Sequence, residues 1–308
     1  MTKNKPYDFQ DPQLLYKLRP QKAETALGTA EYAEIGDGLP VIALHGAMGG
    51  YDQSLILAQT VGSTGYHYIA MSRPGYLGTP IASGKTPEQQ GDLVAALLDK
   101  LGIAKAGVMA VSGGGPSAIQ FGLRHPERCA GLVLASTCAG KMNNPIPFSF
   151  KVTKFLARWP WFVRQFRKKA EKNLVAVAKR SIRDPEILNR TIDDADAWPI
   201  FSALLLSTFD QMGQRLDGVE NDIEITRSTT YPLENLSVPV LAIHGTDDQV
   251  VPFEAHAKKF EARVPNAELL TVEGGEHVAI FTHRDMVRPK VAAFMQNHFC
   301  SQEEKDKR

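Results

Sequence analysis

Short strand-like runs that alternate with helical stretches limit the fold of this chain more than any other feature. The clearest helical stretch, TPEQQGDLVAALLDKLG at 86–102, has Thr86 as N-cap, Pro87 at its first position and Gln89 to complete a capping box. Strands alternating with helices predict an α/β fold, with a mostly parallel central sheet and helices on both faces. The strand-like runs are TAEYAEIG (29–36), VIALHG (41–46), HYIAMS (67–72), GVMAVS (107–112), GLVLAS (131–136), VPVLAIH (238–244) and AELLTV (267–272).

The alternation is interrupted once, by a long interval that contains no strand-like apolar run. This interval, 138–237, is rich in helical and aromatic segments. An insertion here predicts a helical cap over the carboxyl edge of the sheet, where open α/β folds build their sites. We therefore divide the chain into an irregular surface arm (1–28), a core (29–137 and 238–300), the cap (138–237) and a charged tail (301–308).

Composition excludes several classes of protein. The chain has 308 residues, 43% of them hydrophobic, and a formal net charge of +1, which argues against a nucleic-acid partner. Cys129, Cys138 and Cys300 have neither disulfide-like nor metal-like spacing, and the N-terminus has no apolar signal segment. We expect a cytoplasmic protein without cofactor or catalytic metal. The sequence does not indicate an oligomeric state.

The segment MAVSGGGPSAIQ (109–120) reads as a strand, a sharp turn and a helix, with Ser112 at the bend. A serine in such a strained turn needs small neighbours, and Ala110, Gly114 and Gly115 meet that need. The pattern is close to the G-x-S-x-G nucleophile elbow, with Ala110 in place of the first glycine. By itself, a serine in a glycine-rich turn is more often an ordinary turn residue.

A serine nucleophile needs a base and an orienting carboxylate, which on this architecture follow later strands in the order acid, then histidine. HGTDDQVVP (244–252) offers Asp247 and Asp248, and GGEH (274–277) offers His277. No acidic residue occurs from 137 to 170, so the alternative acid position after GLVLAS is empty. The acid must come from the 244–252 loop.

An oxyanion hole would complete this chemistry, with one donor beside the nucleophile and one from an early loop. HGAMGG (45–50) follows the strand VIALH and can supply the second donor. We expect the backbone N–H groups of Gly113 and Ala47 to be the donors. Met48 is the neighbouring alternative to Ala47.

Five motifs together resemble the α/β-hydrolase superfamily: HGAMGG, SRPGYLGT (72–79), AVSGGG (110–115), HGTDDQVVP and GGEH. They are similar to its capped, serine-dependent group of esterases, haloperoxidase-like hydrolases, carbon–carbon hydrolases and proline iminopeptidases. The resemblance implies the α/β-hydrolase fold. It also implies that Asp248 is the acid, because the family's acid lies three residues after the glycine of HG and four before the proline of VVP. His45 and His244 begin HG pairs at strand ends, and we expect them to hydrogen-bond within the loops and not to act as bases.

The resemblance and the residues lead to one expected function. We expect a serine hydrolase that cleaves a carboxylic ester of a small acyl substrate through an acyl-enzyme. Amide or peptide cleavage and carbon–carbon bond hydrolysis are the alternatives. Iminopeptidases have an elbow similar to GGSWG, and this chain has Gly113 in place of that tryptophan, which argues against peptide cleavage. A ligand-binding protein that kept the fold without turnover is the alternative of another class.

The most unusual stretch is 151–183, with 11 Lys or Arg residues and one acid, Glu171. A basic helix with aromatic residues can lie on an anionic membrane surface or attract an acidic substrate. The other interpretation is a solvated cap helix whose aromatic residues pack on the core or line an acyl pocket, and we favour it. The predicted pocket residues are Met48, Phe155, Trp159, Trp161 and Phe162.

Overall fold

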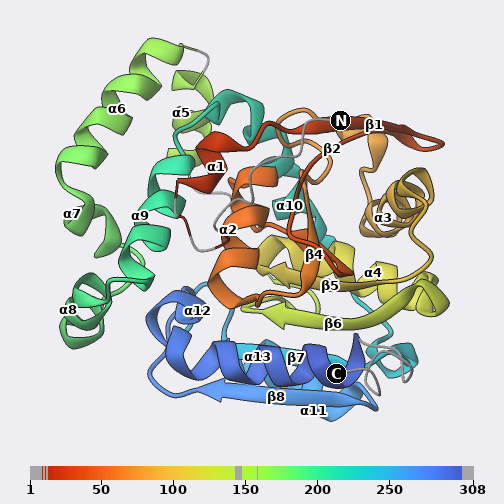
Figure 1. Cartoon of the computed structure of the whole chain (residues 1–308). Coiled ribbons are helices and arrows are strands. Elements are labelled where there is room, and N and C mark those ends of the chain that lie inside the picture. The colour runs from red at the N-terminus through yellow and green to blue at the C-terminus, as the bar shows by residue number, and fades with distance from the viewer. Residues whose placement is uncertain (1–8, 10, 12, 143–147, 158, 300–308) are drawn as a thin grey trace.

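An eight-stranded sheet forms the centre of the protein in the computed structural model, which describes residues 9, 11, 13–142, 148–157 and 159–299 (Figure 1). The strand order is β1-β2-β4-β3-β5-β6-β7-β8. β2 is antiparallel to β1 and β4, and the other neighbours are parallel, as predicted. The strands are β1 Gln21–Thr25, β2 Gly28–Ile35, β3 Leu39–Leu44, β4 Tyr66–Met71, β5 Ala106–Val111, β6 Cys129–Ala135, β7 Val240–Gly245 and β8 Ala267–Val272.

Helices cover both faces of the sheet, because successive side chains of each buried strand point to opposite faces. In β5, Val108 and Ala110 belong to one apolar cluster and Met109 to the other. α2 (Tyr51–Val61) and α13 (Arg284–His298) pack in the cluster with Met109. α3 (Pro87–Leu101), α4 (Gly115–Arg124) and α11 (Phe253–Arg263) pack in the other. The short α12 (Ala279–Thr282) precedes α13.

Local sequence signals predicted these elements closely. The seven predicted strands coincide with β2 to β8 within two residues at each end. The predicted capping box of α3 is confirmed: Thr86 Oγ1 accepts from the Gln89 N–H, and the Gln89 side chain accepts from the Thr86 N–H. Both signals depend on neighbours in the chain, and so they are readable from sequence.

The prediction of an irregular N-terminal arm was wrong for the part that the structure describes. α1 (Leu14–Lys17) buries Leu14 and Leu15, and β1 pairs with β2 from Gln21↔Tyr32 to Thr25↔Gly28. The prolines suggested irregular structure, yet Pro20 immediately precedes β1 and removes no donor from its ladder. β1 thus extends the sheet at its antiparallel edge.

Helices make up the insertion between β6 and β7, where the described residues contain no strand. Figure 1 shows α5 to α8 at one side of the molecule, away from the sheet. None of the described helices is long and apolar enough to cross a bilayer. The helices are α5 Phe148–Leu156, α6 Pro160–Lys172, α7 Leu174–Ala178, α8 Pro185–Asp193, α9 Ala197–Ser207 and α10 Leu216–Ser228.

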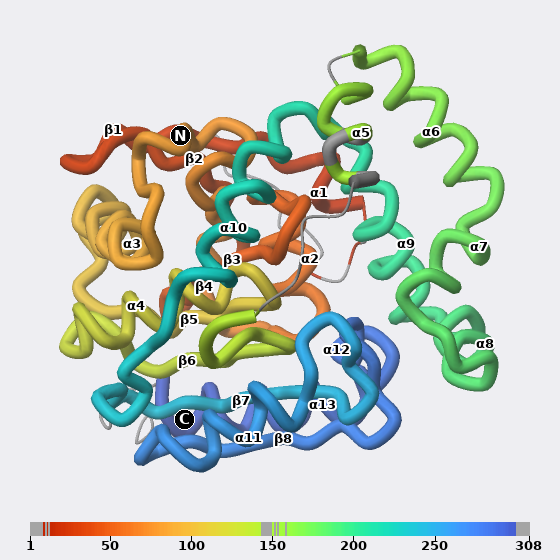
Figure 2. Tube along the Cα trace, turned by 180° about the vertical axis from the view of Figure 1, so that it is seen from behind, coloured from red at the N-terminus to blue at the C-terminus, as the bar shows by residue number. Residues whose placement is uncertain are grey.

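Two buried ion pairs join the last part of the insertion to loops of the core. Arg73, after β4, binds the Asp222 carboxylate of α10 through both terminal nitrogens, at 2.7 and 2.6 Å. In the second pair the arginine belongs to the insertion: Arg215 binds the Asp52 carboxylate of α2 at 3.1 and 2.6 Å. Both arginines are at most 1% exposed. α10 also crosses the loop after β4, where the Gly218 N–H donates to Gly75 O (Figure 2).

Breaking one of these buried pairs should cost far more stability than breaking an exposed pair. Asp222→Ala leaves the Arg73 guanidinium buried without its counter-charge, so the free energy of unfolding should fall by about 3–5 kcal/mol. Urea denaturation measures the change. Glu234→Ala is the matched control, because Glu234 and its partner Arg263 are 58% and 42% exposed. That variant should lose far less stability, because water solvates both charges whether or not they are paired. Equal losses in the two variants would contradict the prediction.

Candidate active site

Ser112 lies on a strained bend between β5 and α4. Its φ is +50°, a left-handed value that is uncommon for residues other than glycine. The Thr137 hydroxyl donates to Ser112 O at 2.6 Å and so ties the bend to the chain after β6. A Cβ atom on Gly115 would lie 1.8 Å from Thr137 Oγ1, so no side chain fits there. The elbow therefore requires its third glycine.

A continuous chain of hydrogen bonds runs from Ser112 through His277 to Asp248. His277 Nε2 lies 3.0 Å from Ser112 Oγ, and His277 Nδ1 lies 2.8 Å from Asp248 Oδ2. The three side chains follow β5, β8 and β7, whose carboxyl ends share one edge of the sheet. The structure thus brings together the three residues that the sequence singled out.

The environment of Asp248 keeps its carboxylate charged. The residue is 3% exposed, and its Oδ1 accepts from the N–H groups of Val250 and Val251, both at 2.9 Å. Burial acts to raise the pKa of Asp248, but hydrogen bonds from His244 and His277 lower it well below its usual range. An ionised Asp248 accepts from His277 Nδ1–H, which leaves Nε2 as an acceptor for the Ser112 hydroxyl.

The neighbouring carboxylate, Asp247, does not take part in this chain. It is exposed and accepts a bond from the Thr246 hydroxyl at 3.2 Å. His244 lies near the end of β7, and its Nε2 lies 2.7 Å from Val251 O of the following loop. Of the two candidate acids, only Asp248 contacts His277 within the described part of the chain.

The loop after β3 lies against the elbow. A Cβ atom on Gly46 would come within 3.2 Å of Ser112 Cβ, and one on Gly113 within 3.4 Å of Ala47 N. The Ala47 N–H donates no hydrogen bond to any residue that the structure describes. Its neighbour Met48 has a φ of +62°, and the Met48 carbonyl accepts from Gln53 and Arg215. Ala47 and Gly113 therefore bring two backbone N–H groups close to Ser112.

Arg73 fixes the orientation of the peptide between Gly46 and Ala47. Its Nη2 donates to Gly46 O at 3.2 Å, and its Nε donates to His45 O at 2.9 Å. The Arg73 N–H donates to His45 Nε2 at 3.0 Å, so His45 Nδ1 carries the proton and donates to Gly46 O at 2.6 Å. Because a trans peptide directs its C=O and N–H to opposite sides, these bonds aim the Ala47 N–H away from Arg73.

His45 itself is a structural residue. It is fully buried, and burial followed by the Arg73 charge holds its pKa well below the usual value. Both ring nitrogens are engaged within the loop. A neutral His45 that accepts from one backbone group and donates to another holds the loop and leaves no nitrogen free to act as a base.

An apolar cavity of about 280 Å³ opens beside Ser112 and His277. Its polar groups are few: Gln53, Ser112 and His277. No group of three His, Cys, Asp or Glu side chains in the described residues is arranged to hold a metal ion. The apolar lining comes from α2, α9, α12, the end of β5 and the loops after β7 and β8, through Ile56, Leu57, Val111, Leu204, Val250, Val278, Ile280 and Phe281.

Comparison with protein families agrees with this fold. Residues 40–178 match a family model described as the alpha/beta hydrolase fold, and residues 221–306 match a second model, described as TAP-like protein. The chain belongs to the α/β-hydrolase superfamily. An α/β hydrolase fold protein from Nakamurella multipartita has a similar structure, with a TM-score of 0.78 and 29% identity, over 90% of this chain and 98% of that one.

Curated relatives of this α/β hydrolase include two different kinds of match. A 2-hydroxy-6-oxononadienedioate/2-hydroxy-6-oxononatrienedioate hydrolase of Dechloromonas aromatica is 26% identical over 86% of this chain and 89% of its own length. The uncharacterized hydrolase YcgS of Bacillus subtilis is 34% identical, but the match covers 43% of this chain and 46% of that protein.

The predicted pocket residues of the α/β hydrolase were wrong. None of the five lines the cavity beside Ser112, whose contribution from the insertion is Leu204 of α9. Met48 turns toward a small cluster with Ala157, Val163 and Leu216. The other four are between 37% and 55% exposed: Phe155, Trp159, Trp161 and Phe162.

Sequence reasoning also missed residues that build the site. The SRPG motif contains Arg73, but nothing in the motif indicates that this side chain binds the carbonyls of His45 and Gly46. Asp222 is 149 residues away in the chain, and no local signal marks it as the partner of Arg73. Leu204, Ile280 and Phe281 line the cavity from helices whose packing only the folded structure reveals.

Enlarging Ala110 tests the construction of the elbow. Ala110 is 1% exposed and lies between Leu44 of β3 and Leu134 of β6. Ala110→Leu should overpack this position and lower the free energy of unfolding by about 1–3 kcal/mol, with slower reaction of Ser112 toward a fluorophosphonate probe. Ala104→Leu, in an exposed loop position, is the control. An Ala110→Leu variant as stable and as reactive as the parent would show that the bend is not built this way.

Proposed function

We propose that this α/β hydrolase is a serine hydrolase that cleaves a carboxylic ester. The observation that carries the proposal is the chain of hydrogen bonds at 3.0 and 2.8 Å linking Ser112, His277 and Asp248. A hydroxyl, an imidazole and a buried carboxylate in this order form a nucleophile, a general base and its orienting group.

The proposed mechanism has two halves. His277 Nε2 takes the proton of Ser112 Oγ as the oxygen attacks the ester carbonyl, and Asp248 stabilises the imidazolium. The N–H groups of Ala47 and Gly113 bind the tetrahedral oxyanion. The imidazolium then protonates the leaving alcohol. Water, deprotonated by His277, attacks the acyl-enzyme and releases the acid with Ser112 restored.

The cavity indicates the kind of acyl group. Its lining is mostly aliphatic and aromatic, and its volume of about 280 Å³ lies at the lower end of small-molecule sites. An apolar acyl group of modest size fits these walls, whereas a charged acyl group would find no ionic partner among the lining residues. We therefore propose an uncharged, short to medium acyl chain.

Carbon–carbon bond hydrolysis is the second candidate, because the relative from Dechloromonas aromatica carries a name of that kind over most of both chains. The same serine and histidine could serve a ketone in place of an ester. Assaying a 2-hydroxy-6-oxo-dienoate beside esters of graded chain length, lactones and amides separates the candidates. A higher kcat/KM on the dienoate would favour the second.

Replacing the nucleophile tests the proposal directly. Ser112→Ala should lower kcat on a short-chain aryl ester by about 10⁶-fold and abolish labelling by a fluorophosphonate probe. Ser136→Ala is a matched control, because Ser136 also has a positive φ, of +46°, at a strand end. Parent protein that neither turns over any ester nor reacts with the probe would favour a ligand-binding protein without turnover.

Two adjacent carboxylates allow a matched test of the acid. Asp248→Asn should lower kcat by about 10⁴-fold, because an amide cannot hold the His277 tautomer or stabilise its cation. Asp247→Asn removes the same charge one residue away on the surface and should leave kcat unchanged. Steady-state kinetics on one ester measure both variants. Equal losses, or a larger loss in Asp247→Asn, would refute the assignment of Asp248.

A further inference from the structure

Exposed apolar side chains gather on one part of the insertion. Of the eleven large hydrophobic residues that are exposed in the described chain, seven lie between 152 and 175. Trp161 and Phe155 are each 55% exposed, and Phe166 is 50% exposed. We call this group the aromatic patch: Val152, Phe155, Trp159, Trp161, Phe162, Phe166 and Val175.

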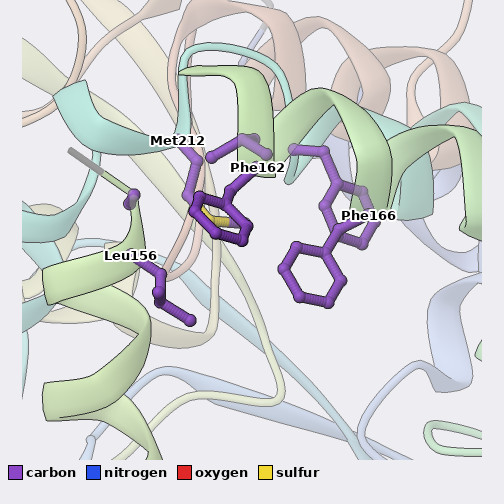
Figure 3. Close-up of a pocket in the computed structure, with 7 residues that line it drawn as sticks. Leu156, Phe162, Phe166 and Met212 are labelled. Atoms are coloured by element: carbon purple, nitrogen blue, oxygen red, sulfur yellow. The ribbon is translucent and has the colours of Figure 1, made fainter. Parts of the chain in front are cut away.

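Two residues of the aromatic patch, Phe162 and Phe166, line a cavity that is separate from the one at Ser112. Phe162 and Phe166 of α6 face Leu156 of α5 and Met212 across it (Figure 3). The cavity is about 230 Å³ and is lined by apolar residues. The rings pair with one another: the centroids of Phe155 and Trp159 are 4.9 Å apart, and those of Trp161 and Phe162 are 4.1 Å apart. The apolar surface of α5 and α6 is thus presented outward.

Cations without an ion pair in the described residues lie on α6 and just after α7. In the described part of the segment 151–183, Lys154, Arg167 and Arg183 make ion pairs. Six other cations have no ion pair with any described residue: Arg164, Lys168, Lys169, Lys172, Lys179 and Arg180. The whole segment has 11 basic residues and one acid, a charge of +10. Because the net charge of the entire chain is +1, the residues outside the segment carry −9.

We propose that the aromatic patch and these six cations dock the protein on an anionic lipid bilayer. Exposed tryptophan and phenylalanine rings partition into the headgroup region, and lysine and arginine beside them attract acidic lipids. The residues outside the segment carry a net charge of −9, so an anionic bilayer repels them while it attracts the segment 151–183. This asymmetry orients the docking. This surface needs no turnover at Ser112, so the inference stands apart from the proposed function.

Co-sedimentation with large vesicles tests the electrostatic part. The protein should bind vesicles of phosphatidylcholine with a quarter phosphatidylglycerol, and bind pure phosphatidylcholine far more weakly. Lys168→Gln, Lys169→Gln and Lys172→Gln together should lower the partition coefficient by about 100-fold, at about 5-fold per cation. Salt at about 0.5 M should weaken the binding of the parent protein to anionic vesicles by a similar factor.

A matched variant controls for net charge. Lys100→Gln, Lys105→Gln and Lys259→Gln remove three exposed cations from α3, the loop before β5 and α11, outside the segment 151–183. This variant should bind as the parent does. Both triple variants should keep the parent's rate of fluorophosphonate labelling, which separates a docking defect from a damaged site. Equal binding by both triple variants would overturn the proposal.

Tryptophan fluorescence tests the insertion of the rings. Two of the three tryptophans, Trp159 and Trp161, belong to the patch and are 45% and 55% exposed. Anionic vesicles should shift the emission to shorter wavelength, and Trp159→Phe with Trp161→Phe should remove the shift while Trp198→Phe keeps it. Absence of a shift, or equal binding to neutral vesicles, would overturn the proposal. So would a concentration-dependent dimer that Phe166→Ser abolishes, because a second copy would then cover the patch.

Discussion

The buried ion pair between Arg73 and Asp222 is the interaction on which the rest of the site depends. One guanidinium holds the carboxylate of α10 and, through its remaining donors, the carbonyls of His45 and Gly46. Tyr76 adds a hydrogen bond to Asp222 at 2.6 Å. Burial acts to lower the pKa of Arg73, and the Asp222 charge outweighs it, so the cation is retained. The direction of the Ala47 N–H follows from this anchored charge.

Strain and packing act together at Ser112. The positive φ costs conformational energy, and the surrounding contacts keep it: Thr137 holds the carbonyl, and the glycines let the loop after β3 approach. Gly113 cannot carry a side chain, because a Cβ there would lie 2.8 Å from Asp222 Oδ2. The elbow, the loop and α10 are therefore packed as one unit, in which the nucleophile and two N–H groups keep fixed relative positions.

Local sequence patterns predicted most of the fold and the residues of the proposed triad. Strand runs, the capping box of α3 and the small residues around Ser112 are all encoded within a few neighbours, and the motifs at 248 and 277 follow strands in a known order. The arrangement of the insertion is different. Where α5 and α6 sit depends on contacts with distant segments, and so the aromatic residues were expected at the substrate and are found at the surface. The partnership of Arg73 with Asp222 is equally non-local.

The two anchors divide the insertion unequally. Arg215 and Asp222 bind the stretch from η4 (Met212–Gln214) through α10 into the core, while α5 to α8 lie between β6 and these anchors without a comparable ion pair to the core strands in the described residues. α7 and α8 reach the core through apolar packing instead, with Ala178 and Leu188 in the same cluster as Phe281 of the site. The exposed rings of α5 and α6 belong neither to that cluster nor to the two ion pairs. The outer face of the insertion can therefore vary in sequence while the peptide that faces Ser112 keeps its supports.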